Sequence, residues 1–134
     1  MSILANYLAQ LIKAQLNGEK PVSVPEEIQV DDLIHLSCKN HMEYLVMGAL
    51  LKTDGISEEI QGILRSHVMR SIVRTTTQIM DLKEIIRRFE EKKIVNQPMK
   101  GAQMKFIYPS PEMREMSDID ILIRHDCMDR AAEE

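Results

Sequence analysis

Apolar residues recur every three or four positions through the first two thirds of the chain, which is the period of amphipathic helices. The pattern predicts a first helix over residues 2–17, ended by Gly18, and then a linker over residues 19–25 that contains two prolines. Two shorter helices are expected within residues 25–53, with a break near residues 39–41. This part of the chain is therefore expected to be a helical array.

The strongest periodic segment runs from Ser57 to Lys93, with Ser57 as a suitable N-cap. Its apolar positions define one face: Ile60, Leu64, Val68, Ile72, Thr75, Ile79, Leu82, Ile86 and Phe89. Three consecutive threonines at 75–77 favour a kink, because β-branched residues weaken a helix locally. The opposite side is basic: Arg65, Arg70, Arg74, Lys83, Arg87, Arg88 and Lys92. It is interpreted either as a solvated surface paired with nearby glutamates or as a surface that faces phosphates or nucleic acid.

The pattern changes after Lys93. Residues 94–98 are short, β-branched and closed by a proline, which is typical of a strand and its exit. A short helix is predicted over residues 102–108, and a second strand over residues 117–124. The predicted fold class is α+β, mostly α: an N-terminal helical array over residues 1–93, followed by a β-α-β segment.

Composition and charge exclude several classes of protein. The 134 residues carry a formal net charge of −4, so nucleic-acid binding would need a local basic patch. Cys38 and Cys127 form no CxxC pair and are expected to be unpaired thiols in a reducing compartment. No window approaches the run of about 18 apolar residues that a membrane span needs, and the N-terminus lacks the pattern of a signal peptide. The expected localisation is the cytoplasm, without a membrane partner.

Two acids stand at a spacing of two within an apolar run, in Ser117-Asp118-Ile119-Asp120-Ile121-Leu122. In a strand, alternation would place Asp118 and Asp120 on one side and the isoleucines on the other. Carboxylates that project from such positions can bracket divalent ions, and hard oxygen ligands favour Mg²⁺ or Mn²⁺. The alternative is that both acids are simply the solvated face of an edge strand. Spacing alone leaves these two interpretations equally weighted.

Gly101 lies between the first strand and the short helix, where backbone N–H groups could meet a phosphate. A single glycine at such a place is more often an ordinary turn. The order strand, glycine, helix and paired acids is therefore the signal, rather than the glycine by itself.

Together, Lys100-Gly101-Ala102, Tyr108-Pro109, Arg114 and Met116 to Leu122 resemble the signature of an uncharacterised bacterial nucleotidyltransferase family. This family belongs to the superfamily that includes DNA polymerase beta and the aminoglycoside nucleotidyltransferases. The resemblance covers residues 94–134. It implies a nucleotidyltransferase fold, and it implies transfer of a nucleoside monophosphate from an NTP to an acceptor that could be a protein, an RNA or a small molecule.

By position, the resemblance implies that Asp118 and Asp120 are the catalytic metal ligands and that Gly101 lines the triphosphate. Lys100 and Arg114 are the further candidates for phosphate contact. The chain departs from the superfamily in having Ala102 after the glycine, which removes a hydroxyl contact.

The family's third carboxylate comes from a later strand, so residues 94–134 are expected to be a partial, truncated nucleotidyltransferase-like domain. The alternative function is a catalytically inactive nucleotidyltransferase-like module for binding or regulation, and a third hypothesis is a helical nucleic-acid binder. A two-stranded sheet would also leave an edge that a second copy of the chain could cover.

Overall fold

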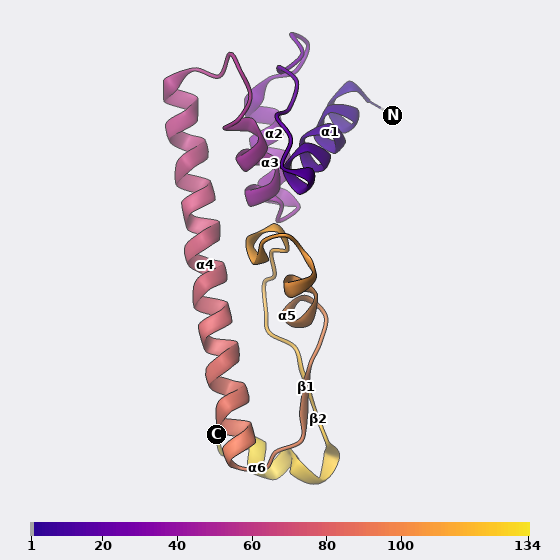
Figure 1. Cartoon of the computed structure of the whole chain (residues 1–134), viewed down its shortest axis with the longest axis vertical. Helices are drawn as coiled ribbons and strands as arrows, with labels where there is room; N and C mark the ends of the chain where they lie inside the picture. Colours follow the sequence, from indigo (N-terminus) through magenta and orange to yellow (C-terminus); the bar gives the residue numbers. More distant parts are fainter. Residues whose placement is uncertain (1) are drawn as a thin grey trace. The chain divides into compact units, whose positions relative to one another are not determined.

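A computed structural model describes residues 2–134 and shows an α+β protein that is mostly helical, as predicted (Figure 1). The chain divides into two compact units, Met1–Val73 and Arg74–Glu134, and the division falls inside the longest helix. The sequence predicts that a nucleotidyltransferase-like domain begins at residue 94. The boundary between the two compact units does not test that prediction, which stays a prediction.

The first unit contains α1 (Ile3–Asn17), α2 (Val30–Lys39), α3 (Glu43–Leu50) and the beginning of α4 (Glu58–Glu91). Ser2 caps α1, since its hydroxyl accepts a hydrogen bond from the Ala5 N–H at 3.2 Å. Gly18 ends the helix with φ 69°, a conformation that glycine adopts without steric cost. The first predicted helix and its stop are confirmed.

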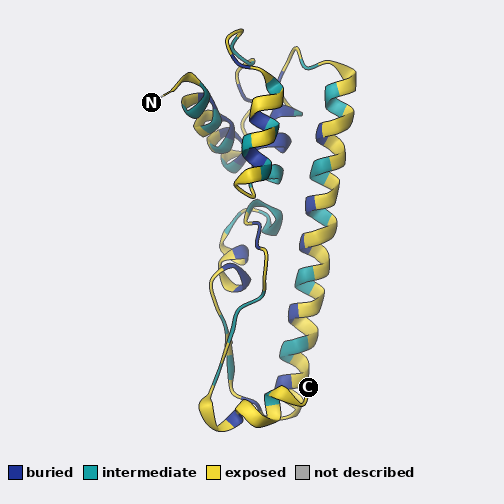
Figure 2. Cartoon of the chain, turned by 180° about the vertical axis from the view of Figure 1, so that it is seen from behind, coloured by how far each residue is buried: buried dark blue, intermediate teal, exposed yellow. Residues whose placement is uncertain are grey.

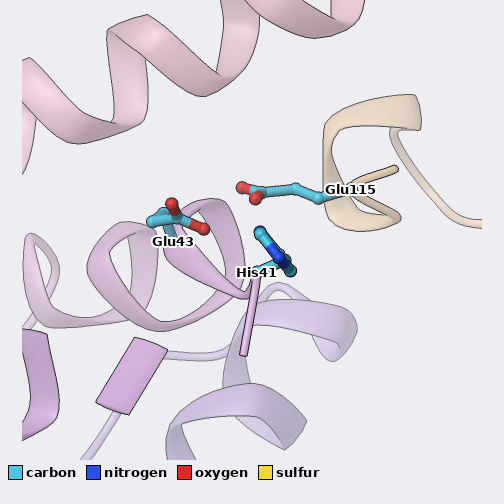
Figure 3. Close-up of side chains that lie close together, drawn as sticks. All are labelled: His41, Glu43 and Glu115. Atoms are coloured by element: carbon cyan, nitrogen blue, oxygen red, sulfur yellow. The ribbon is translucent and has the colours of Figure 1, made fainter. Parts of the chain in front are cut away.

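The predicted break between the second and third helices is also confirmed. It lies at residues 40–42, where His41 has φ 53°. Figure 3 shows His41 beside Glu43, the residue with which α3 begins. From there α3 is buried over most of its length, and it packs with α1, α2 and the start of α4 into one apolar core: Tyr7, Leu11, Ile28, Leu33, Val46, Met47, Ala49, Leu50 and Leu64.

The long predicted helix is confirmed as α4, Glu58–Glu91. The helix runs through residues 75–77 without a break, so the threonines do not interrupt it. All nine positions of the predicted apolar face are buried or half-buried, and Figure 2 shows the blue and teal stripe that they form. Lys93 then adopts φ 54°, and the Ile94 N–H donates to the Phe89 carbonyl at 2.7 Å, which is a left-handed C-terminal cap.

The basic side of α4 is partly neutralised within its own surface. Glu84 accepts hydrogen bonds from Arg87 and Arg88, each at 2.8 Å, and Arg87 also pairs with Glu91. These arginine contacts hold the pKa of Glu84 at about 2. At the C-terminal end of α4 the basic side is therefore solvated and paired with glutamates. This is the first of the two interpretations of that surface.

The second unit contains the remainder of α4, the strands β1 (Asn96–Pro98) and β2 (Ile121–Ile123), and the short helices α5 (Gly101–Met104) and α6 (Met128–Ala132). The strands lie side by side and pair antiparallel, with Asn96 opposite Ile123 and Pro98 opposite Ile121 (Figure 1). Two apolar clusters hold this unit together: Leu82 with Ala102 and Met116, and Phe89 with Ile94 and Cys127.

The second strand is shorter than predicted. Residues 117–120 precede β2 as a bend and an irregular segment, so Asp118 and Asp120 do not lie on the strand itself. Aspartate is a poor strand former. In addition, the chain turns from β1 into α5 shortly after Pro98, so β1 offers little main chain for pairing with β2. The predicted short helix is likewise reduced to α5, and a 3₁₀ turn over Lys105–Ile107 continues it.

Two further expectations concern thiols and membranes. Cys38 and Cys127 do not form a disulfide with each other. Within residues 2–134, none of the helices combines the length and the apolar character that a membrane crossing requires.

Candidate functional site

Asp120 is tied to the strand pair through its main chain. The Met99 N–H donates to the Asp120 carbonyl at 2.9 Å, one step beyond the last paired residues of the ladder. Asp118 lies in the bend before it and is exposed. The two acids therefore lie at one end of the sheet. At this end β1 continues into α5, and the segment that starts at Met116 enters β2.

The isoleucine side of the predicted alternation is present even though the strand is short. Ile119, Ile121 and Ile123 are half-buried and pack against the two apolar clusters of this unit. Asp118 is exposed, and the side chain of Asp120 keeps 37% of its surface accessible. The core thus receives the isoleucines, and the carboxylates stay within reach of a ligand.

Lys100 supplies a cation to these acids. Its Nζ lies 2.9 Å from Oδ2 of Asp120. The hydrogen bond and charge of Asp120 raise the pKa of the Lys100 ammonium, and the charge of Asp118 adds to this. The Lys100 ammonium therefore contacts Asp120 directly, whereas Asp118 acts on it only through its charge.

Gly101 is required for space rather than for backbone conformation. A Cβ at this position would lie 3.0 Å from the Cβ of Met116, a distance that would force one of the two segments to move. Its φ is not positive, and the unusual backbone belongs to the preceding Lys100, at φ 49° and ψ −124°. The glycine lets the start of α5 approach the segment that leads to Asp118.

Arg114 is exposed, and its guanidinium donates to the Glu115 carbonyl at 2.5 Å. Glu115, drawn in Figure 3, is buried and lies 3.9 Å from Arg74. Of the predicted site residues, the structure brings Lys100 and Asp120 into contact, and Asp118 lies two residues before Asp120 in the exposed bend. Arg114 is instead turned towards its own main chain.

Lys105 is the residue that sequence reasoning missed. Its side chain is fully buried, and Nζ donates to the Arg114 carbonyl at 2.9 Å, the Pro111 carbonyl at 3.4 Å and Thr75 Oγ1 at 3.5 Å. Burial lowers the pKa of the Lys105 ammonium, and the charges of nearby glutamates offset this lowering only in part. A signal was present: Lys105 stands three and four positions after Ala102 and Gly101, on the face of α5 that is buried.

The acids fit a hard divalent cation by donor chemistry, since both offer carboxylate oxygens from an accessible surface. In the part of the chain that the structure describes, they do not belong to any group of three ligating side chains within 4.8 Å of one another. The pair would therefore need further ligands, such as triphosphate oxygens or water, to complete the coordination of Mg²⁺.

A cavity of about 530 Å³ in the second unit is a separate feature. It lies on the isoleucine side, between α4 and the chain end, and its lining includes Ile85, Phe89, Ile119 and Ala131 but neither acid. It holds no part of the candidate site.

Comparisons with known proteins place the chain in a family. No curated protein and no solved structure matches the chain significantly. A family model described as "Uncharacterised nucleotidyltransferase" matches residues 26–134, which extends the similarity from the predicted residues 94–134 back through α2, α3 and α4. The match covers most of the chain and includes the glycine turn and both acids. The chain therefore belongs to this uncharacterised nucleotidyltransferase family.

Proposed function

We propose that the chain is an Mg²⁺- or Mn²⁺-dependent nucleotidyltransferase that transfers a nucleoside monophosphate from an NTP to an acceptor. Family membership supports a nucleotidyltransferase-like function. The observation that supports the metal assignment is that Asp118 and Asp120 stand two residues apart on an accessible segment, where Asp120 already holds one cation, the Lys100 ammonium, with Nζ 2.9 Å from Oδ2. Neighbouring carboxylates supply the negative charge and the hard oxygen ligands that a divalent ion requires.

In this proposal Asp118 and Asp120 would hold the metal, and Lys100 and the main chain at Gly101 would contact the triphosphate. A bound divalent ion supplies charge stabilisation at the attacking and leaving oxygens. The acceptor nucleophile forms a bond to the α-phosphorus, the bond to pyrophosphate breaks, and pyrophosphate leaves with the negative charge. The chain's own contribution is to orient the phosphates and to keep the acids on the accessible side.

A second candidate is a nucleotidyltransferase-like module that binds nucleotide but does not transfer it. The observation in its favour is the pair of carboxylates without a third ligating side chain nearby among residues 2–134. Without a third acid, no carboxylate is positioned to accept a proton from an acceptor hydroxyl.

The test begins with binding. Mn²⁺ and each of the four ribonucleoside triphosphates would be titrated into the wild-type chain, the variant Asp118→Asn with Asp120→Asn, and the control Asp129→Asn, which removes an exposed acid from α6. We expect Mn²⁺-dependent NTP binding by the wild type and the control and its loss in the double variant. Unchanged binding in the double variant would refute the metal assignment.

Transfer would then be measured with α-³²P-labelled NTPs and separate protein, RNA and small-molecule fractions of a cell extract as acceptors. Label that appears in one fraction, and only with both aspartates present, would support the enzyme and identify the class of acceptor. Metal-dependent NTP binding without label transfer to any fraction would favour the binding module.

A further inference from the structure

The ion pair between Lys100 and Asp120 lies where the proposed metal would bind. Nζ of Lys100 is 2.9 Å from Oδ2 of Asp120, a direct contact with one of the two proposed ligands. Asp118, two residues before Asp120, lies on the exposed bend that precedes this contact. The Lys100 ammonium is therefore a monovalent cation at the proposed metal site.

The backbone fixes the two partners next to each other. Met99 donates its N–H to the Asp120 carbonyl at 2.9 Å, and the Lys100 carbonyl accepts from the Met104 N–H at 2.8 Å. The Cα of Lys100 is therefore held between the end of β1 and the start of α5. Only its side chain is free to move.

That side chain can leave at little cost. The Lys100 side chain is 71% exposed, and ion pairs between exposed side chains are weak because water screens both charges. Lysine also carries its charge on a flexible stem, unlike the rigid fork of arginine. A divalent ion and the ammonium cannot both occupy the space against the same carboxylate oxygens, since like charges repel at such distances.

We propose that Lys100 is an exchangeable counter-cation: its ammonium neutralises Asp118 and Asp120 while the site is free, and it moves to the triphosphate when the metal–nucleotide complex binds. This inference rests on the proposed function. It adds that metal and nucleotide bind with positive coupling. Metal alone must displace the ammonium into water, whereas the metal–nucleotide complex offers the ammonium new phosphate partners.

The test compares Lys100→Met with the wild type and with Lys83→Met, which removes the same charge from an exposed position on α4. Mn²⁺ alone would be titrated first, with free Mn²⁺ measured by electron paramagnetic resonance. We expect Lys100→Met to bind Mn²⁺ roughly three- to tenfold more tightly than the wild type, because the competing charge is gone. The Lys83→Met variant is expected to match the wild type.

The preformed complex of Mn²⁺ with inorganic tripolyphosphate would be titrated next. Here Lys100→Met is expected to bind more weakly than the wild type, because the phosphates have lost a cationic partner. Both changes are required. Equal Mn²⁺ affinities of the wild type and Lys100→Met, or an unchanged affinity for the complex, would overturn the exchange while leaving the proposed function in place.

Failure of the proposed function gives a different result. If neither the wild type nor Lys100→Met binds Mn²⁺, although both keep the same helical circular dichroism, the acidic pair is not a metal site at all. Binding by Lys100→Met that is lost again when Asp120→Asn is added would show that the affinity comes from the proposed ligand.

Discussion

Replacing Lys105 by methionine tests whether the buried ammonium holds the segment that leads to the acids. Lys105 is fully buried, and it donates to two carbonyls that flank the 3₁₀ turn Pro111–Met113. Methionine has a similar length and fits a buried site, but it cannot donate a hydrogen bond. The substitution therefore removes the hydrogen bonds and keeps most of the packing.

The size of the effect follows from the three contacts. The bond to the Arg114 carbonyl at 2.9 Å is short and charge-assisted, and such a bond contributes about 1.5–3 kcal/mol. The contacts at 3.4 Å and 3.5 Å are long and add little. Removing a buried charge also relieves its desolvation cost, which offsets part of the loss. We expect the free energy of unfolding to fall by about 1–2 kcal/mol at pH 7.

The pH dependence gives a second, independent readout. The pKa of Lys105 is lowered in the folded chain from 10.5, so between the lowered value and 10.5 the unfolded chain binds one proton more than the folded chain. The stability contributed through this group therefore rises with pH in that window. The methionine variant lacks this gain. The difference in the free energy of unfolding between wild type and Lys105→Met is therefore expected to widen as the pH is raised towards 10.5.

Urea unfolding followed by circular dichroism at several pH values between 7 and 10.5 measures both effects, with Lys83→Met as an exposed control. Hydrogen exchange of residues 105–116 would show whether the loss is local to the segment that Lys105 contacts. The reasoning would be refuted if wild type and Lys105→Met had the same free energy of unfolding at pH 7 and remained equal up to pH 10.5.

Gly101→Ala is expected to lower the free energy of unfolding by about 1–3 kcal/mol, since the new Cβ would lie 3.0 Å from that of Met116. In contrast, Gly62→Ala, where nothing lies within 4 Å, should raise it by about 1 kcal/mol, and urea unfolding distinguishes the two. Lys93→Gly should raise the melting temperature, because φ 54° is unfavourable for lysine. The Glu84 carboxyl should titrate by nuclear magnetic resonance at about 2, and replacing both of its arginine partners by methionine should move the pKa back towards 4.5. Because this pKa is depressed, the stabilising effect of the pairs is present above pH 4.5 and is lost as the pH falls through about 2.

The helical part could be predicted from the sequence because its signals are local and repeated. Ser2 and Gly18 mark the two ends of α1 through caps whose chemistry is contained in single residues. The apolar face of α4 extends over many turns, so that single exceptions do not obscure its period. Such signals do not depend on which distant segment the helix meets.

The details of the second unit could not be predicted because they depend on pairs that are far apart in the sequence. The length of β2 is set by β1, whose chain turns away after Met99. The spacing of Lys105 from Gly101 and Ala102 is only a weak sign of burial, and the burial is explained by Thr75, 30 positions away, and by the carbonyl of Arg114. A charged side chain is otherwise expected on the surface.

The position of the acids outside the ladder favours a shared cation. Within a regular strand, side chains two positions apart have bases about 6.5–7 Å apart and project in parallel, because the pleat fixes their direction. Here only Asp120 is tied to β1, through the Met99 N–H, and Asp118 lies in a bend that is not bound by the pleat. Its carboxylate is therefore free to turn towards the charge that Asp120 already contacts. The shorter strand thus removes the regular strand geometry on which the metal prediction was based, and it leaves Asp118 and Asp120 as proposed ligands, of which Asp120 already contacts the Lys100 ammonium.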